Sequence, residues 1–196
     1  MPAASGPALV ELLDAALPQT QCTRCGFDGC RPYAEALARG ESAVNRCPPG
    51  GIPVIARLSA LLGVPPLPLD ASCGSEQAPR VARVVEADCI GCAKCIDACP
   101  TDAIVGARRW MHAVIAADCS GCELCIPACP VDCIVMDPAP GLPPALLDGA
   151  GIERRARHYR RLYDGRLQRL ARNERRRREA LQARLGASQE AGGGAP

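Results

Sequence analysis

Apolar residues in the first third of the chain are spaced as on one face of a short helix. Three stretches show this spacing, and we predict a helix in each of them: residues 7–17, 31–41 and 52–62. Pro18 follows the first stretch and Gly40 lies at the end of the second, and both are ordinary stop signals for a helix. We therefore predict a small helical domain over residues 1–62. Residues 63–80, rich in proline and without apolar periodicity, are predicted to be a linker.

The middle of the chain repeats itself. The sequence ADCIGCAKCIDACPTDAIV at 87–105 aligns without gaps on ADCSGCELCIPACPVDCIV at 117–135, with 13 of 19 positions identical. A short apolar run lies on each side of each copy, which predicts a strand, a short helix starting near the last cysteine, and a second strand. We expect residues 81–137 to form one domain with two similar halves and a pseudo-twofold axis.

The last quarter of the chain has a different character. A second linker rich in proline and glycine is predicted at 138–150. Residues 151–186 carry apolar residues at helical spacing among many arginines, so we predict a long charged helix with Gly165 as a weak point. Residues 187–196 have the composition of a disordered tail.

Composition changes this picture because the chain has little material for a core. Its 196 residues include 14 cysteines but only one Phe, one Trp and three Tyr. Small domains with so few large apolar residues usually need covalent or metal cross-links. The N-terminus lacks the basic segment of a signal peptide, and no run of about 18 apolar residues occurs, so we expect no N-terminal membrane helix. We expect a cytoplasmic location, where thiols bind metal more often than they form disulfides.

Charge is divided unevenly along the chain. Residues 1–152 hold 10 Lys and Arg against 16 Asp and Glu, a net charge of −6. Residues 153–185 hold 13 Arg against 4 Asp and Glu, a net charge of +9. An acidic body is thus joined to a basic extension, and the two are expected to have different tasks.

The repeat carries the cysteine spacing of a bacterial two-cluster ferredoxin. Each copy reads Cys-x2-Cys-x2-Cys-x3-Cys-Pro, and in such proteins the fourth cysteine of each run binds the other cluster. One [4Fe–4S] cluster is therefore assigned to Cys89, Cys92, Cys95 and Cys129, and the second to Cys119, Cys122, Cys125 and Cys99. Gly91 and Gly121 are expected to let the backbone approach the sulfur atoms and donate N–H bonds to them. Zinc needs only pairs of Cys-x2-Cys and leaves the remaining pattern unexplained.

A third group of cysteines lies near the start of the chain, at Cys22, Cys25, Cys30 and Cys47. Four soft ligands suit either a structural zinc ion or an iron–sulfur cluster, and their spacing is less specific than the ferredoxin run. On spacing alone, both metals remain open.

Several motifs together resemble the RnfB/RsxB family, the B subunits of the Rnf electron-transport complex, which is also called Rsx. They are LPQTQC, CGFDGCRPYAEAL, NRCPPGG, the double ferredoxin run and VGARRWMHAV, and the resemblance covers residues 7–137. It implies a [4Fe–4S] cluster on the N-terminal cysteines, and so three [4Fe–4S] clusters in all. It also implies electron transfer between soluble carriers and a membrane-bound redox complex coupled to ion movement. The Arg-rich extension lies outside the resemblance.

Four further residues have less obvious roles. Cys73 lies in the first linker and is expected to be a free thiol. Cys133 is interpreted as a small buried apolar residue, because Ala103 takes its place in the first copy. Trp110 and His112 suit either the lining of a cluster or a docking face, but we expect them simply to cover the small core.

Taken together, the fold class is predicted to be α+β, built from small metal-stapled domains: a helical 4Fe–4S domain, a two-cluster ferredoxin-like domain and a charged helix. No nucleotide loop or catalytic set occurs, so we expect an electron carrier between unknown redox partners rather than a self-contained enzyme. The first alternative is a peripheral subunit of a membrane-bound ion-translocating oxidoreductase, on the cytoplasmic face of the inner membrane. The second is a nucleic-acid-binding iron–sulfur protein. The basic extension suits an acidic protein, an anionic membrane or nucleic acid as partner.

Overall fold

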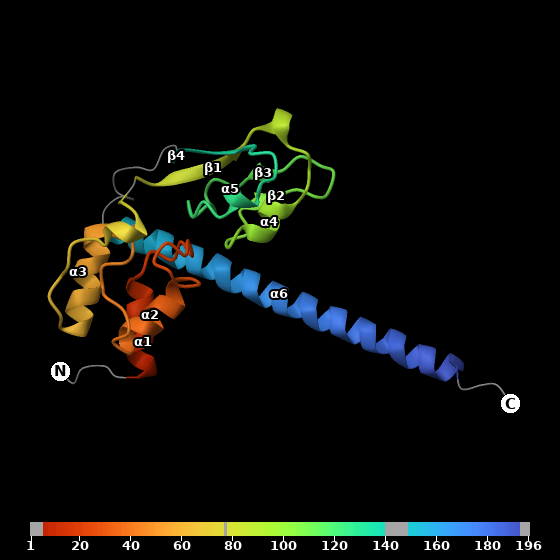
Figure 1. Ribbon diagram of the computed structural model, residues 1–196, viewed down its shortest axis with the longest axis horizontal. Helices are drawn as coiled ribbons and strands as arrows, with labels where there is room; N and C mark the ends of the chain where they lie inside the picture. Colours follow the sequence, from red (N-terminus) through yellow and green to blue (C-terminus); the bar gives the residue numbers. More distant parts are fainter. Residues whose placement is uncertain (1–5, 77, 140–148, 193–196) are drawn as a thin grey trace.

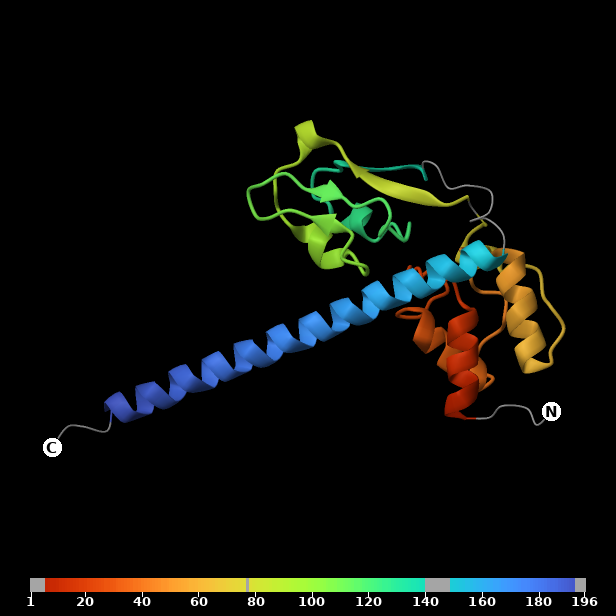
Figure 2. The same cartoon turned by 180° about the vertical axis from the view of Figure 1, so that it is seen from behind.

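The computed structural model describes residues 6–76, 78–139 and 149–192. A cluster of three helices at the N-terminus and a domain of short strands and helices lie side by side (Figure 1). A long helix begins between them, runs along both and then extends away from the body, as the view from behind also shows (Figure 2). The expected mixture of helix and strand in small domains is confirmed.

The N-terminal domain consists of α1 (Pro7–Ala16), α2 (Cys30–Ala38) and α3 (Gly51–Leu62). The three helices agree with the predicted stretches to within a few residues. Their apolar faces meet in a core whose most deeply buried side chains include Leu13, Tyr33 and Leu58. The Tyr33 hydroxyl donates to the carbonyl of Ala43 at 2.8 Å and accepts from the N–H of Arg46 at 3.2 Å, so the one polar atom of this buried ring has partners.

The first linker is held against this domain. A short 3₁₀ helix, η1 (Ala71–Cys73), is capped by the Asp70 carboxylate, which accepts from the N–H of Ser72. Asp70 also pairs with Arg46 at 3.3 Å, and Asn45 donates to the carbonyl of Pro68 at 2.6 Å. Proline and the lack of apolar periodicity disfavour regular structure in this segment, but they do not exclude packing.

The repeat folds as β1 (Arg80–Val84), α4 (Lys94–Ala98) and β2 (Ile104–Val105), followed by β3 (Ala113–Val114), α5 (Cys125–Ala128) and β4 (Ile134–Pro138). A second 3₁₀ turn, η2 (Glu86–Asp88), leads from β1 to the first cysteine. The outer strands β1 and β4 pair antiparallel, with Ala82 opposite Met136. The inner strands β2 and β3 also pair antiparallel, with Ile104 opposite Val114. Each half of the repeat thus contributes one strand to each of two small sheets.

One local expectation for the repeat is wrong. The apolar pattern predicts short helices that start near the fourth cysteine of each run, but α4 ends before Cys99 and α5 ends before Cys129. Both cysteines have extended backbone, with ψ of 116°. The proline that follows each of them disfavours helical backbone at the preceding residue, so each helix must end there.

The C-terminal helix α6 spans Gly149–Gly192 and is longer than expected. It continues through Gly165 without a break and extends beyond residue 186, so the expected disordered tail is helical as far as Gly192. Glu and Arg four residues apart support it, as in the pairs Arg175–Glu179 and Arg178–Glu174. Most of the second linker, 140–148, and the last residues, 193–196, lie outside the described residues.

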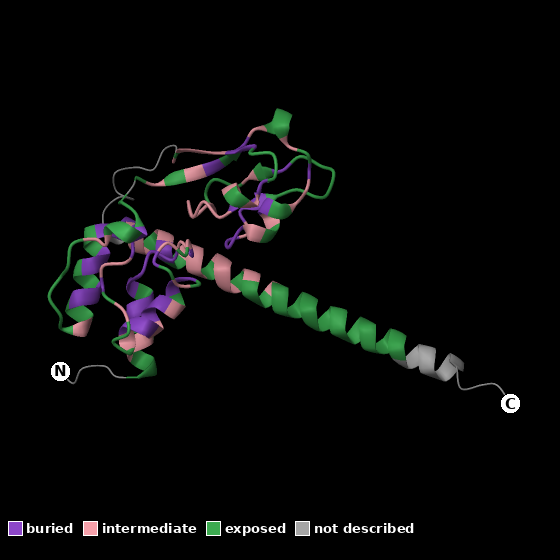
Figure 3. Cartoon of the chain, viewed as in Figure 1, coloured by how far each residue is buried: buried purple, intermediate pink, exposed green. Residues whose placement is uncertain are grey.

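The first half of α6 contacts both domains, whereas residues 171–185 are exposed throughout (Figure 3). On the N-terminal domain, Arg160 pairs with the buried carboxylate of Asp14. On the repeat domain, Arg166 and Arg169 both donate to Asp102 at 2.6 Å. These three arginines therefore form ion pairs with the two domains, while the arginines beyond residue 171 face solvent.

Candidate metal centres

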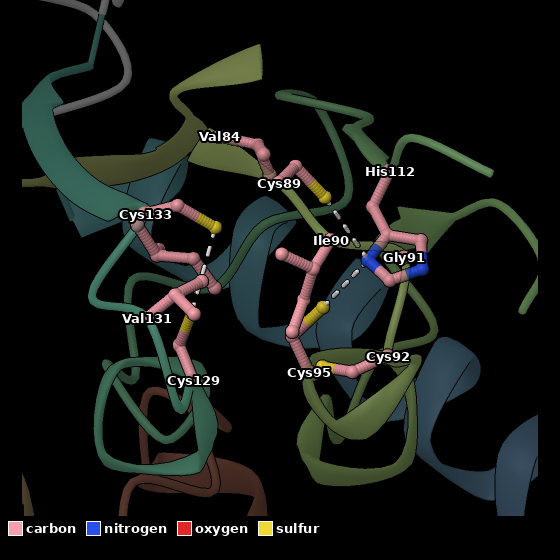
Figure 4. Close-up of a pocket in the computed structure, with 11 residues that line it drawn as sticks. Val84, Cys89, Ile90, Gly91, Cys92, Cys95, His112, Cys129, Val131 and Cys133 are labelled. Atoms are coloured by element: carbon pink, nitrogen blue, oxygen red, sulfur yellow. Dashed lines mark hydrogen bonds between the residues drawn. The ribbon is translucent and has the colours of Figure 1, made fainter. Parts of the chain in front are cut away.

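One cavity in the repeat domain is surrounded by cysteines from both copies of the repeat. Its lining includes Cys89, Cys92, Cys95 and Cys129 (Figure 4). Three of these belong to the first run, and the fourth belongs to the end of the second run. These are the four residues that the spacing assigns to one cluster, and we call this place the Cys89 site.

A second cavity lies at the equivalent place beside the other cysteine run. Its lining includes Cys119, Cys122, Cys125 and Cys99, again three cysteines of one run and the last cysteine of the other. The exchange of the fourth cysteine follows from the extended backbone at Cys99 and Cys129, which lets each residue leave its own helix and reach the opposite site. All eight cysteines predicted for the repeat thus line two separate cavities, and we call the second one the Cys119 site.

Backbone N–H groups point at several of these sulfur atoms. The N–H of Ala103 donates to Cys99 Sγ at 3.3 Å, and the N–H of Ala82 donates to Cys119 Sγ at 3.4 Å. Such donors stabilise negative charge on sulfur, which a metal-bound thiolate carries. The donor set therefore fits a group held by thiolates.

The two glycines singled out in the repeat allow parts of the chain to approach each other closely. Both have positive φ, 67° at Gly91 and 70° at Gly121. A Cβ at Gly91 would lie 2.7 Å from the backbone nitrogen of Trp110, and one at Gly121 would lie 2.7 Å from the carbonyl oxygen of Arg80. The residues between the first two cysteines of each run are thereby packed against backbone from another part of the domain. The expected N–H bonds from these glycines to sulfur stay a prediction.

The N-terminal cysteines also come together. Cys25, Cys30 and Cys47 are buried, and Cys22 is half-buried. Burial raises the pKa of Cys47 well above its usual value, and the nearby thiols of Cys30, Cys22 and Cys25 raise it further. Cys25, Cys30 and Cys47 belong to one buried cluster, and Cys22 is near enough to act on Cys47, so we call this group of four cysteines the N-terminal site.

The loop that carries Cys22 and Cys25 has an unusual backbone. Gln19, Gln21 and Thr23 all have positive φ, of 58°, 55° and 59°. Buried side-chain amides hold this shape: Gln21 donates to Gln19 Oε1 at 2.9 Å and accepts from the N–H of Cys30 at 2.9 Å. Arg160 of α6 also donates to Gln19 Oε1, at 3.1 Å. A hydrogen-bonded chain thus connects the long helix to the backbone of a candidate ligand.

Burial keeps several of these thiols protonated when no metal is bound. It raises the pKa of Cys30 to about 12, of Cys122 to about 11 and of Cys125 to about 12. A metal must displace these protons in order to bind, and the thiolates it creates no longer carry an uncompensated buried charge.

The described residues contain no three Cys, His, Asp or Glu side chains that are close enough to hold a single metal ion.

The N-terminal site lies beside the Cys119 site rather than the Cys89 site. Ser120 Oγ donates to the carbonyl of Thr20 at 3.0 Å, and Arg24 pairs with Glu123 at 2.7 Å. Thr20 and Arg24 are each two residues from Cys22, while Ser120 and Glu123 line the second cavity. The two ligand loops are therefore in direct contact.

Three residues that the sequence does not assign as ligands, Cys73, Cys133 and Trp110, also lie in the two domains that hold the cysteine groups. Cys73 is buried and lies close enough to the N-terminal group to raise the pKa of Cys25, after the larger effect of burial. Cys133 is buried, as expected, and its sulfur lies 3.4 Å from Cys129 Sγ (Figure 4). Trp110 is exposed, so it does not cover the core as expected.

His112 takes the place that the sequence offered only as an alternative, the lining of a cluster. We expected it to cover the core, but it lines the first cavity with its ring directed at two cysteine sulfurs (Figure 4). A signal is present in the repeat, because extending the alignment upstream places His112 opposite Ala82. This exchange of alanine for histidine is a chemical difference between the two copies at a position close to their cysteines.

Comparison with known proteins supports iron–sulfur chemistry in both the repeat domain and the N-terminal domain. A family model described as a 4Fe-4S dicluster domain matches residues 82–136, and one described as a putative Fe-S cluster matches residues 17–49. No solved structure matches the chain. In the described residues, no helix is long and apolar enough to cross a membrane.

Curated relatives carry one name, the B subunit of an ion-translocating oxidoreductase complex. The chain is 58% identical over 110 residues to the relative from Alkalilimnicola ehrlichii, a match that covers 56% of this chain and 59% of the relative. It is 57% identical over 109 residues to the relatives from Thiobacillus denitrificans and Pseudomonas aeruginosa, covering 56% of this chain and 58% and 56% of those proteins. The chain thus spans less than three fifths of the length of the relatives it matches. The predicted resemblance is confirmed over the matched residues.

Proposed function

We propose that this chain, a relative of the B subunits of ion-translocating oxidoreductase complexes, is an electron-transfer protein with three [4Fe–4S] sites. The observation that carries the proposal is the pair of cavities in the repeat domain. The lining of each includes four cysteines of the two runs, three from one run and one from the other, in the arrangement expected of a two-cluster ferredoxin, and Cys133 also lines the first cavity.

The ligand sets follow the cavities and the shared electrostatics of the thiols. We assign one cluster to Cys89, Cys92, Cys95 and Cys129, another to Cys119, Cys122, Cys125 and Cys99, and a third to Cys22, Cys25, Cys30 and Cys47. The family model over residues 17–49 supports iron rather than zinc for the third set. When bound, each cluster takes up and releases one electron. The chain holds the thiolates, keeps most of them from water and directs backbone N–H groups at them.

The contacts between loops suggest an order for the three sites. Because the Thr20–Ser120 and Arg24–Glu123 contacts join the N-terminal loop to the Cys119 loop, we place the Cys119 site in the middle of the relay. The Cys89 site then lies at one end and the N-terminal site at the other. Which end receives electrons depends on the partners.

The names of the relatives suggest who those partners are. Since those proteins are subunits of a complex, we propose that this chain binds other subunits of such a complex at a membrane surface, as well as a soluble donor or acceptor. The distal arginines of α6 suit docking on an anionic membrane or an acidic partner, because residues 171–185 are exposed. Ending the chain after residue 171 removes this basic arm and leaves the proximal contacts intact. Loss of salt-sensitive membrane binding in that variant would support the proposal, whereas loss of nucleic-acid binding would favour the alternative.

Anaerobic purification followed by iron, sulfide and zinc analysis tests the number of clusters. Three cubane clusters require about twelve irons and about twelve sulfides per chain. With one zinc and only about eight irons, the N-terminal cluster would be removed from the proposal. EPR of the reduced protein then distinguishes clusters that carry an electron from adventitious iron. Fewer than about eight irons would contradict the assignment of the two cavities.

A further inference from the structure

The ring of His112 lies within hydrogen-bonding distance of cysteine sulfur. The side chain is 2% exposed, and its Nδ1 lies 3.3 Å from Cys95 Sγ and 3.8 Å from Cys89 Sγ. Figure 4 shows the ring between the two sulfurs at the edge of the cavity. The other ring nitrogen, Nε2, is buried and has no hydrogen-bond partner among the described residues. The polar contacts of this buried ring are therefore directed entirely at sulfur.

The backbone makes room for the imidazole at a specific point. Gly106 follows β2 with φ of 146°, and a Cβ there would lie 2.5 Å from Cδ2 of His112. Gly106 and His112 stand one step beyond the paired residues Val105 and Ala113 of β2 and β3. A side chain at residue 106 would displace the ring from the sulfurs.

The Cys119 site has the opposite arrangement. Thirty residues from His112 and Gly106 lie Ala82 and Met136, which are paired across β1 and β4. Both line the cavity of the Cys119 site. A small residue therefore stands where the Cys89 site has its histidine, and a large residue stands where it has its glycine. The Cys119 site has a methyl group where the Cys89 site has a ring N–H.

The chemistry of the acceptor decides which nitrogen carries the proton. A metal-bound thiolate only accepts hydrogen bonds, so the contact is favourable when Nδ1 is protonated. An N–H directed at sulfur stabilises the additional negative charge of a reduced cluster, and such bonds are among the features that set cluster potentials. The Cys89 site has this donor from the side chain of His112, whereas the methyl side chain of Ala82 has none, and only its backbone N–H donates to Cys119 Sγ, at 3.4 Å.

We propose that His112 is a positioning residue that raises the reduction potential of the Cys89 cluster. The proposal rests on the proposed function, because it needs a cluster at each site. This effect favours an electron at the end of the relay that lies farther from the N-terminal domain. The asymmetry arises from one exchanged pair of residues in two otherwise similar halves.

The test is a redox titration of the anaerobically purified full chain, followed by EPR. His112→Leu fills the space without a donor, and His112→Gln restores an N–H donor of similar length. The double substitution Ala82→His with Met136→Gly transfers the arrangement to the other site. We expect His112→Leu to shift one midpoint potential to more negative values and leave the others unchanged. His112→Gln should recover part of that shift, and the transferred pair should raise a different midpoint potential.

The iron content separates the failure of this inference from the failure of the proposed function. If the wild-type chain binds no clusters, the proposed function fails. If His112→Leu retains the wild-type iron content and all midpoint potentials are unchanged, the role of His112 is overturned and the clusters remain. An equal shift of all potentials would also overturn it, as would loss of one cluster in both His112→Leu and His112→Gln, because the residue would then be needed for assembly.

Discussion

Replacing Asp102 by Asn is expected to release the long helix from the repeat domain. Asp102 accepts from Arg166 at 2.6 Å and from two nitrogens of Arg169, at 3.1 and 2.6 Å. Arg166 also donates to the backbone carbonyls of Ile96 and Asp97. The φ of Asp102 is 53°, a conformation that Asn tolerates as well as Asp does. The substitution therefore removes the charge without adding backbone strain.

The size of the effect follows from the exposure of the three side chains. Arg166 is 11% exposed, whereas Asp102 and Arg169 are 35% and 41% exposed. Partly exposed ion pairs contribute up to about 1 kcal/mol each, and the better-buried pair lies toward the upper end of that range. Loss of both charge-assisted pairs should cost about 1.5 kcal/mol of docking free energy. This corresponds to about a tenfold smaller docking equilibrium constant.

Hydrogen exchange measured by mass spectrometry reads this equilibrium directly. Amides of residues 160–170 should exchange about tenfold faster in Asp102→Asn, because the undocked helix opens more often. The exposed residues 171–185 should be unaffected. Asp132→Asn is the matched control: Asp132 occupies the same position in the second copy with φ of 50° but makes no ion pair with the described part of the chain. Unchanged exchange in Asp102→Asn, or equal acceleration in both variants, would refute the reasoning.

Three further predictions concern the N-terminal domain and the ligand loops. Arg160→Met leaves the Asp14 carboxylate buried without its cation, so denaturant titration should show a free energy of unfolding lower by about 2 kcal/mol. Arg160→Lys should restore part of this loss, and an unchanged unfolding midpoint in Arg160→Met would contradict the pairing. Gly91→Ala places a Cβ 2.7 Å from the backbone nitrogen of Trp110, so iron analysis should show about four fewer irons per chain. Full iron content would show that the Cys89 site does not need this close approach of the two backbone segments. Cys73→Ser should keep the wild-type iron content and EPR spectrum; loss of a cluster would make Cys73 a ligand.

The ligand-bearing loops were the most predictable part of the molecule. Spacings such as Cys-x2-Cys-x2-Cys act over a few residues, so the sequence determines which three sulfurs turn toward one point. The fourth sulfur is supplied by a residue that the following proline holds in extended backbone, and this too is local. The same rule accounts for the ends of α4 and α5, which the pattern of apolar residues did not reveal.

Contacts between distant segments were beyond the sequence reasoning. The charge of the C-terminal helix indicated a basic extension, but its register against Asp14 and Asp102 depends on how two domains lie relative to each other. The burial of Cys73 has the same origin, because the linker follows Asn45 and Arg46 of the N-terminal domain. Charge and proline content describe how a segment behaves alone, whereas these contacts depend on the surface against which it packs.

The position of α6 connects this packing to electron transfer. Arg160 holds Asp14 and Gln19, and Gln19 in turn holds the Gln21 side chain that binds the N–H of Cys30. Further along the same rigid helix, Arg166 and Arg169 hold the repeat domain. A helix anchored on both domains restricts how far the N-terminal loop can move from the Cys119 loop, which it contacts through the Thr20–Ser120 hydrogen bond and the Arg24–Glu123 ion pair. Because electron transfer between sites weakens steeply as they separate, the proposed relay requires these two loops to stay together, and α6 restrains them.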